Sequence, residues 1–350
     1  MGSQTRSPRA LGFRWPAEWE PQQSVWLAWP HDASLWPIPL EPVWPTIADL
    51  IVELAAVQRV DLLVQNRDTS EHAKRWLADA RQRRNVSETD IAFHFIPTDD
   101  SWLRDIGPIF LEGDGTQTAV AWNFNGWGKF VPYDTDAQVG TRITEEAGVS
   151  IHRPNVVLEG GAIDGNGRGL VLTTEQCLLQ PNRNPELGKR DYERLLRDFL
   201  GAEAVVWLGD GLFNDHTDGH VDVVTRFTAP NRVVTLWTND KNDPSFPALE
   251  ENRRRLEAVG FKNESLEIVE LPLPEPVMFE GKRLAAGYAN FVIANGLVIV
   301  PTYDCDADRQ ALGIVARQFP DRRVIGLSAV ELLKGGGAFH CLTQQQPASA

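Results

Sequence analysis

The sequence predicts a mixed α/β fold built as a circular array of related units. Short strand-like runs alternate with amphipathic helical segments along the whole chain. Three predicted hairpins of similar length, at 162–172, 220–236 and 288–300, recur at intervals of about sixty residues, and the repeated order is hairpin, helix, strand. A doubly wound sheet would instead alternate single strands with helices and contain few hairpins.

Each element is predicted from its own pattern. In the segment 69–84, Ala73, Trp76, Leu77 and Ala80 follow the helical period, and Asp164-Gly165-Asn166-Gly167 is a strong hairpin turn. In chain order the predicted strands are 24–29, 60–64, 91–96, 109–112, 118–123, 156–158, 169–173, 220–227, 232–238, 288–293, 297–301 and 323–326. The predicted helices are 44–58, 69–84, 134–147, 192–200, 245–259 and 306–318.

The composition is that of a folded protein with an acidic surface. Residues of the hydrophobic class make up 42% of the 350 residues, and 48 acidic against 34 basic side chains give a net charge of −14. A phosphate backbone would be repelled, so nucleic acid is not expected as a partner. A small cationic ligand would be attracted to a cleft lined by such charge.

The chain shows no sign of a membrane span or of a secretory signal, and no linker divides it. We therefore expect a single catalytic domain over 1–350, located in the cytoplasm, with an ordered core at about 13–347 and flexible ends at 1–10 and 348–350. The three cysteines are far apart and lack CxxC spacing, which argues against a disulfide framework and against a cysteine zinc site.

A glycine-rich stretch near the end of the chain precedes a candidate nucleophile. Gly335-Gly336-Gly337 lets the backbone approach a ligand closely, and Cys341 follows among small polar residues. A reactive thiol needs a partly open, polar setting in which its thiolate is stabilised. The alternative is an inert buried cysteine at the start of a final strand. If this stretch is extended, His340 points away from Cys341 and packs or hydrogen-bonds elsewhere.

Acids and a histidine elsewhere in the chain complement this thiol. Asp105 lies in a loop rich in acids, Glu159 precedes Gly160-Gly161, and Asn290 precedes a predicted hairpin strand. His220 and Asp222 are two apart on a predicted strand and should share one face. One thiol, one histidine and three carboxylates suit a planar guanidinium, whose N–H donors match carboxylate acceptors.

Other readings of these residues stay open at this point. Asp105 could form an ordinary ion pair with Arg104, and Glu159 could simply tie a turn. Asp218, His220 and Asp222 could hold a divalent metal in a metal-dependent hydrolase. A non-catalytic module that binds guanidinium or polyamine groups is the non-enzymatic alternative.

In combination, these motifs resemble the agmatine deiminase family, which is related to the bacterial peptidylarginine deiminases among the guanidine-modifying enzymes. The resemblance covers about residue 13 to Pro347 and rests on the stretches 15–21, 25–30, 102–108, 159–161, 217–222 and 335–345. It implies the pentein fold, a five-bladed α/β propeller with pseudo-fivefold symmetry. It also implies hydrolysis of a guanidinium through a covalent amidino-cysteine, with a role in putrescine and polyamine metabolism.

The resemblance assigns roles to individual residues. Cys341 would be the nucleophile and His220 the general acid and base, Asp105 and Asp222 would grip the guanidinium, and Glu159 would lie beside His220. Trp102 would line the pocket, with Arg104, Gly337 and Asn290 as further expected substrate contacts. No metal or organic cofactor is expected. The resemblance also implies a homodimer.

The segment 123–130 departs from the family pattern, which looks richer in Gly and Ala with a longer insert. This departure bears on the far end of the substrate, so peptidyl or free arginine remains an alternative to agmatine.

Overall fold

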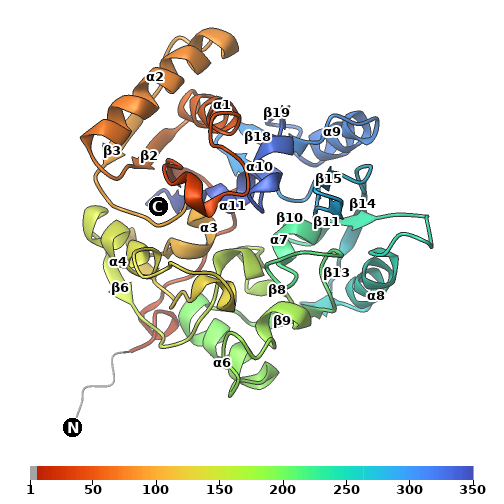
Figure 1. Cartoon of the computed structure of the whole chain (residues 1–350). Helices are drawn as coiled ribbons and strands as arrows, with labels where there is room; N and C mark the ends of the chain where they lie inside the picture. Colours follow the sequence, from red (N-terminus) through yellow and green to blue (C-terminus); the bar gives the residue numbers. More distant parts are fainter. Residues whose placement is uncertain (1–5, 263, 350) are drawn as a thin grey trace.

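Five sheets of the computed structural model share one plan (Figure 1). The structure describes residues 6–262 and 264–349, and within them each of these sheets pairs a first strand antiparallel to a second, which pairs parallel to a third. A helix connects the second strand of each unit to the third. The units follow one another around a common centre, so the predicted circular array and its five-bladed form are confirmed.

The strands occupy equivalent places in the five units. The first strands are β4 (Ile109–Gly113), β7 (Ile163–Gly165), β10 (Thr225–Ala229), β17 (Val292–Ala294) and β20 (Gln344–Pro347). The second strands are β5 (Thr116–Val120), β8 (Leu170–Thr174), β11 (Arg232–Trp237), β18 (Leu297–Thr302) and β1 (Gln22–Ala28). The third strands are β6 (Ser150–His152), β9 (Ala204–Leu208), β14 (Glu267–Pro272), β19 (Arg323–Ser328) and β2 (Arg59–Leu63).

The connecting helices lie outside the strands and bury one face against them (Figure 1). They are α4 (Asp136–Glu146), α6 (Lys189–Leu200), α8 (Phe246–Glu257), α9 (Ala307–Gln318) and α1 (Trp44–Ala55). In α6, Tyr192, Leu196 and Leu200 recur every four residues and are buried, and Gly201 ends the helix with a φ of +74°. The last unit adds α2 (Arg67–Arg84) and a fourth strand, β3 (Ile91–His94).

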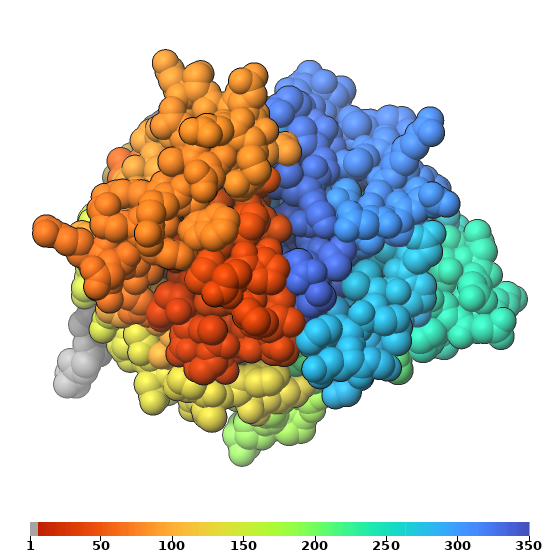
Figure 2. Space-filling view, turned by 45° about the horizontal axis from the view of Figure 1, so that its top comes forward, coloured from red at the N-terminus to blue at the C-terminus, as the bar shows by residue number. Residues whose placement is uncertain are grey.

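The two ends of the chain close the ring. Strand β20 pairs antiparallel with β1, with Val25 opposite Gln345, so the fifth unit takes its first strand from the C-terminal end. Figure 2 shows the red and orange N-terminal part packed directly against the blue C-terminal part. The thiol near the C-terminal end of the chain is therefore held in place by a sheet that also contains a strand from the N-terminal part.

Short turns precede the first strands and meet at the centre. They are α3 (Leu103–Ile106), η4 (Gly160–Ala162), α7 (Val221–Val224) and α11 (Phe339–Leu342), and α3 lies against both α11 and η4.

Two predictions were wrong here. The segment 220–227 is not strand throughout, because Asp218 and Gly219 take positive φ (65° and 84°) and one helical turn intervenes before β10. The stretch around Cys341 is helical rather than extended.

Three further predictions need adjustment. Residues 156–158 form only an isolated bridge between Val157 and Asn123, and the predicted hairpin is β7 with β8. Strand β17 begins at Val292, so 288–291 is irregular. The expected flexible ends fall partly outside the described residues, at 1–5 and 350, whereas Arg9–Leu11 forms a 3-10 turn. Among the helices described, none is both long and apolar enough to cross a bilayer.

Candidate active site

Every unit of the ring contributes to one central site from the segment just ahead of its first strand. Asp105 precedes β4, Glu159 precedes β7, His220 and Asp222 precede β10, Asn290 precedes β17, and Cys341 precedes β20. All of them are buried. The circular arrangement therefore brings together side chains that lie far apart in the sequence.

The thiol of Cys341 lies at the inner end of a cavity of about 300 Å³, which Trp102, Asp105 and Gly337 also line. The Asn290 side-chain Nδ2 lies 3.2 Å from its Sγ, and Asp222 Oδ2 lies 3.9 Å from it. Burial, and then the negative charges of Asp222 and Asp105, raise the pKa of the Cys341 thiol well above its ordinary value. The thiol is therefore protonated at neutral pH in the free protein.

The imidazole of His220 is fully buried, and neither ring nitrogen has a nitrogen or oxygen hydrogen-bond partner. Nδ1 lies 3.8 Å from Asp105 Oδ1. Burial lowers the pKa of His220, but Asp105, Cys177 and Glu159 outweigh it and raise the pKa well above its ordinary value. His220 and Cys341 also line a common small cavity of about 20 Å³. The imidazole of His220 and the thiol of Cys341 therefore face the same space.

Asp105 is fixed by two donors. Its Oδ1 accepts from the Gly161 backbone N–H at 2.9 Å, and its Oδ2 accepts from Trp127 Nε1 at 2.9 Å. A Cβ at position 161 would lie 2.6 Å from His220 Nδ1 and 2.8 Å from Asp105 Oδ1, so only glycine fits there. Burial raises the pKa of Asp105. The positive charge of His220 opposes this shift.

Asp222 belongs to a chain of buried charges behind the site. His340 Nδ1 lies 2.6 Å from Asp222 Oδ2, and His340 Nε2 lies 3.0 Å from Glu18 Oε2, which in turn pairs with Arg226. Burial alone would raise the pKa of Asp222, but the hydrogen bond and charge of His340 lower it. Asp222 Oδ1 is buried and has no hydrogen-bond partner among the residues described.

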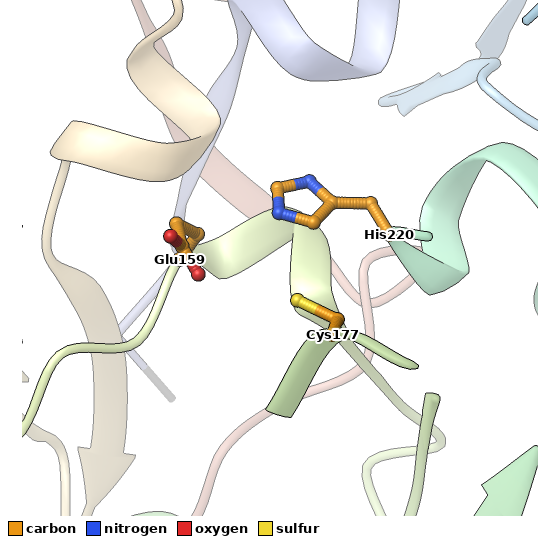
Figure 3. A group of neighbouring side chains, drawn as sticks. All are labelled: Glu159, Cys177 and His220. Atoms are coloured by element: carbon orange, nitrogen blue, oxygen red, sulfur yellow. The ribbon is translucent and has the colours of Figure 1, made fainter. Parts of the chain in front are cut away.

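Glu159 has one occupied and one free oxygen. Its Oε1 accepts from Arg183 Nε at 2.9 Å, while Oε2 is buried without a partner. Arg183 also donates to the Thr217 carbonyl at 2.9 Å and pairs with Asp218. Glu159 lies beside Cys177 and His220, and one ligand atom from each of the three lies within 4.8 Å of the others (Figure 3).

Of the predicted site residues, Trp102, Asp105, Gly337 and Cys341 line the larger cavity, and His220 and Asn290 line the smaller one, whereas Arg104 lines neither. Its Nη1 donates to Gln344 Oε1 at 2.7 Å and to Gln345 Oε1 at 2.8 Å, so it braces α3 against the C-terminal strand. This placement speaks against its predicted substrate contact. Trp102 stacks on Trp36 with ring centroids 5.3 Å apart, and a Cβ at Gly337 would lie 2.6 Å from the Trp102 ring.

The proposed metal trio of Asp218, His220 and Asp222 does not form a ligand group. Asp218 bonds to Arg183, Lys129 and Asn182, and Asp222 is committed to His340. His340 is a hydrogen-bonding residue, as expected. Within 6–262 and 264–349, the residues whose ligand atoms do converge are Glu159, Cys177 and His220.

Several residues of the site escape the sequence-based analysis. Trp127 bonds to Asp105 from the segment 123–130, where the departure from the family pattern was the available signal. Asp136 and Asp100 line the outer cavity, and Cys177 lies beside His220. No sequence pattern marks Asp136 or Cys177, because their positions depend on contacts between units.

Comparisons with known proteins show the family of the chain. The family model described as Porphyromonas-type peptidyl-arginine deiminase matches residues 14–347. The agmatine deiminase of Pseudomonas aeruginosa is 37% identical over 374 aligned positions, which cover 99% of each chain. The solved agmatine deiminase of Enterococcus faecalis superposes with a TM-score of 0.92 at 34% identity, again over 99% of each chain.

Further solved structures extend the likeness. The agmatine deiminase of C. jejuni with substrate bound has a TM-score of 0.85 at 28% identity, over 95% of this chain and 96% of that one. An amidinotransferase from Microseira wollei, at 12% identity and a TM-score of 0.53 over 96% of this chain and 97% of that one, shares the fold alone. The chain belongs to the Porphyromonas-type peptidyl-arginine deiminase family.

Proposed function

We propose that this protein is an agmatine deiminase, which hydrolyses the guanidinium of agmatine to N-carbamoylputrescine and ammonia. The acidic lining of the cavity carries the proposal. Asp100, Asp105 and Asp136 line it, and its lining side chains include no lysine or arginine among the residues described. Agmatine is cationic at both ends and has no carboxylate, so this cavity complements it along its length.

Free arginine would need a cation for its carboxylate, and the candidate arginines are not available for that task. Arg104, Arg183 and Arg226 are buried and bonded to protein groups. Arg309 is exposed on α9, outside the cavity lining. Agmatine is therefore favoured over free arginine.

Substrate binding would activate the nucleophile. A guanidinium between Asp105 and Asp222 neutralises the charges that raise the pKa of Cys341, and the thiol loses its proton to solvent. The thiolate then attacks the central carbon and forms a C–S bond. His220, as imidazolium, gives a proton to the departing nitrogen, the C–N bond breaks, and ammonia leaves an amidino-thioether on Cys341.

The second half of the reaction uses the same groups. Neutral His220 takes a proton from water, and the resulting hydroxide adds to the carbon of the thioether. The C–S bond breaks, the thiolate is regenerated, and the ureido product gives up its extra proton. The product is neutral at that end, so the carboxylates hold it less strongly than the guanidinium, which favours release.

An ammonia-release assay with agmatine, free arginine and an arginine-containing peptide at equal concentrations tests the proposal, with Cys341→Ala as the control. We expect release with agmatine to exceed release with either arginine substrate. Preference for arginine or the peptide would overturn the substrate assignment. Ammonia release from none of the three would favour a non-catalytic guanidinium-binding protein.

A further inference from the structure

A second buried thiol lies beside the imidazole of His220. Cys177 is in the short helix α5 (Glu175–Leu178), where the Thr174 hydroxyl accepts its backbone N–H at 3.2 Å. One ligand atom each from Glu159, Cys177 and His220 lie within 4.8 Å of one another. Figure 3 shows the carboxylate and the thiol facing the same side of the ring. The proposed reaction assigns no bond-making role to this thiol.

Buried polar atoms in this group lack partners. Glu159 Oε2 and both nitrogens of His220 make no hydrogen bond to a nitrogen or oxygen atom of the described residues. All three residues have no measurable solvent exposure. Buried polar atoms are normally satisfied, so an unpartnered carboxylate oxygen and an unpartnered imidazole beside one thiol indicate a place for a ligand.

The surrounding charge suits a divalent cation. Asp105 Oδ1 lies 3.8 Å from His220 Nδ1, and Asp222 Oδ2 would lie 3.2 Å from a Cβ built on the adjacent Gly161. Arg183 opposes this field from the far side of Glu159, where it occupies Oε1 and leaves Oε2 free. Against these three carboxylates stand Arg183 beside Glu159 and His340 beside Asp222, so acidic side chains outnumber basic ones around the group.

We propose that Glu159, Cys177 and His220 form an inhibitory site for a thiophilic divalent cation of the zinc class. Thiolate, imidazole and carboxylate are the ligands that zinc prefers, and three of them leave a fourth position open. On binding, the Cys177 thiol and the coordinating nitrogen of His220 each lose a proton to solvent, and their lone pairs form the metal bonds. On its other side, His220 lines the small cavity of about 20 Å³ that it shares with Cys341.

The consequence for catalysis follows from His220. A metal on the imidazole occupies the lone pair that would carry the proton to ammonia, so deimination stops while Cys341 stays free. The inhibition rests on the proposed function. The metal binding does not, and the two are measured separately.

The test uses the full-length protein after treatment with a chelator. Zn²⁺ binding is measured by equilibrium dialysis, and Co²⁺ is used as a spectroscopic probe because thiolate ligation gives a charge-transfer absorption. We expect one Zn²⁺ per chain and the thiolate–Co²⁺ band in the native protein, in Cys341→Ala and in Cys305→Ala. Cys305 is a free thiol outside the group and serves as the matched control. In Cys177→Ala the band should disappear and the affinity should fall by about 10-fold or more.

Glu159→Gln is the second variant, because it keeps the shape of the side chain if Cys177→Ala does not fold. It should weaken Zn²⁺ binding in the same direction while the thiolate–Co²⁺ band remains. In the ammonia assay, Zn²⁺ should inhibit the native protein and Cys305→Ala equally, and the chelator should reverse the inhibition. If the thiolate–Co²⁺ band were lost in Cys341→Ala and kept in Cys177→Ala, the metal would bind the catalytic thiol and the proposed site would be wrong. Absence of stoichiometric Zn²⁺ from the native protein would remove the site altogether.

Discussion

His340 fixes Asp222: its Nδ1 lies 2.6 Å from Asp222 Oδ2, and both side chains are buried. The same carboxylate oxygen lies 3.9 Å from the Cys341 sulfur, while its other oxygen has no partner. A guanidinium that enters the cavity therefore meets a carboxylate whose orientation is already set. Because His340 is in the same short helix as Cys341, α11 positions both the nucleophile and the acid that faces it.

Cys341→Ala should abolish turnover while leaving agmatine binding largely intact. The alanine removes only the sulfur, whereas Asp105 and Asp222 remain to hold the guanidinium. Ammonia release and calorimetric titration of agmatine check the two parts separately. Substantial residual ammonia release would rule out a covalent intermediate on Cys341.

Asp222→Asn should weaken both binding and catalysis. A hydrogen bond to a charged group contributes roughly 1.5–3 kcal/mol, so KM should rise about 10- to 100-fold. Asparagine keeps the shape of the side chain and can still bond to His340, which separates loss of charge from loss of structure. Unchanged KM in this variant would show that Asp222 does not hold the substrate.

Alkylation of Cys341 by iodoacetamide should be slow at neutral pH and become fast only in alkaline solution. Burial, Asp222 and Asp105 raise the pKa of this thiol, so little thiolate exists in the free protein near pH 7. Asp222→Asn should shift the alkylation profile to lower pH, because it removes one negative charge. Glu71→Gln, on the exposed face of α2, is the matched control and should leave the profile in place. Fast alkylation of the native thiol at pH 7 would contradict this account.

Asp136→Asn should reduce the preference for agmatine over 1-butylguanidine, which lacks the distal ammonium. Burial raises the pKa of Asp136 to about 8, so the carboxyl is mostly protonated below that pH and ionises above it. The agmatine ammonium stays charged up to a pKa of about 10, as for lysine. The ratio of the two kcat/KM values should therefore rise between pH 6 and 9 in the native protein and stay flat in the variant. If the ratio of the two kcat/KM values did not change with pH in the native protein, Asp136 would not be the group that binds the distal ammonium of agmatine.

Glu18→Gln should destabilise the fold. Glu18 pairs with the fully buried Arg226, and removing one partner of a buried ion pair costs about 3–5 kcal/mol. Burial alone would raise the pKa of Glu18, but Arg226 and His340 lower it well below its ordinary value. The stability that ionised Glu18 contributes is thus fully present above the pKa of about 4.3 that a glutamate has in the unfolded chain. It is lost as the pH falls toward the lowered pKa of the folded state. Urea unfolding at pH 7 and at pH 4 measures both effects, and a variant as stable as the native protein at pH 7 would refute the prediction.

The sequence by itself determined the repeating units and the chemical groups of the site. Hydrophobic periods and the turn at 164–167 are local, so the helices and most strands follow from neighbouring residues alone. The thiol, the histidine and the acids were recognised as residue types that suit a guanidinium, each beside glycines or at the start of a hairpin.

Only the tertiary structure decided how these side chains face one another. His220 and Asp222 lie in a helical turn rather than a strand, Arg104 turns to the C-terminal strand, and Cys177 lies beside the imidazole. The physical reason is that the turns ahead of the first strands are too short to hold a conformation alone. Packing between neighbouring units around the ring sets their geometry, and no local sequence pattern records that packing.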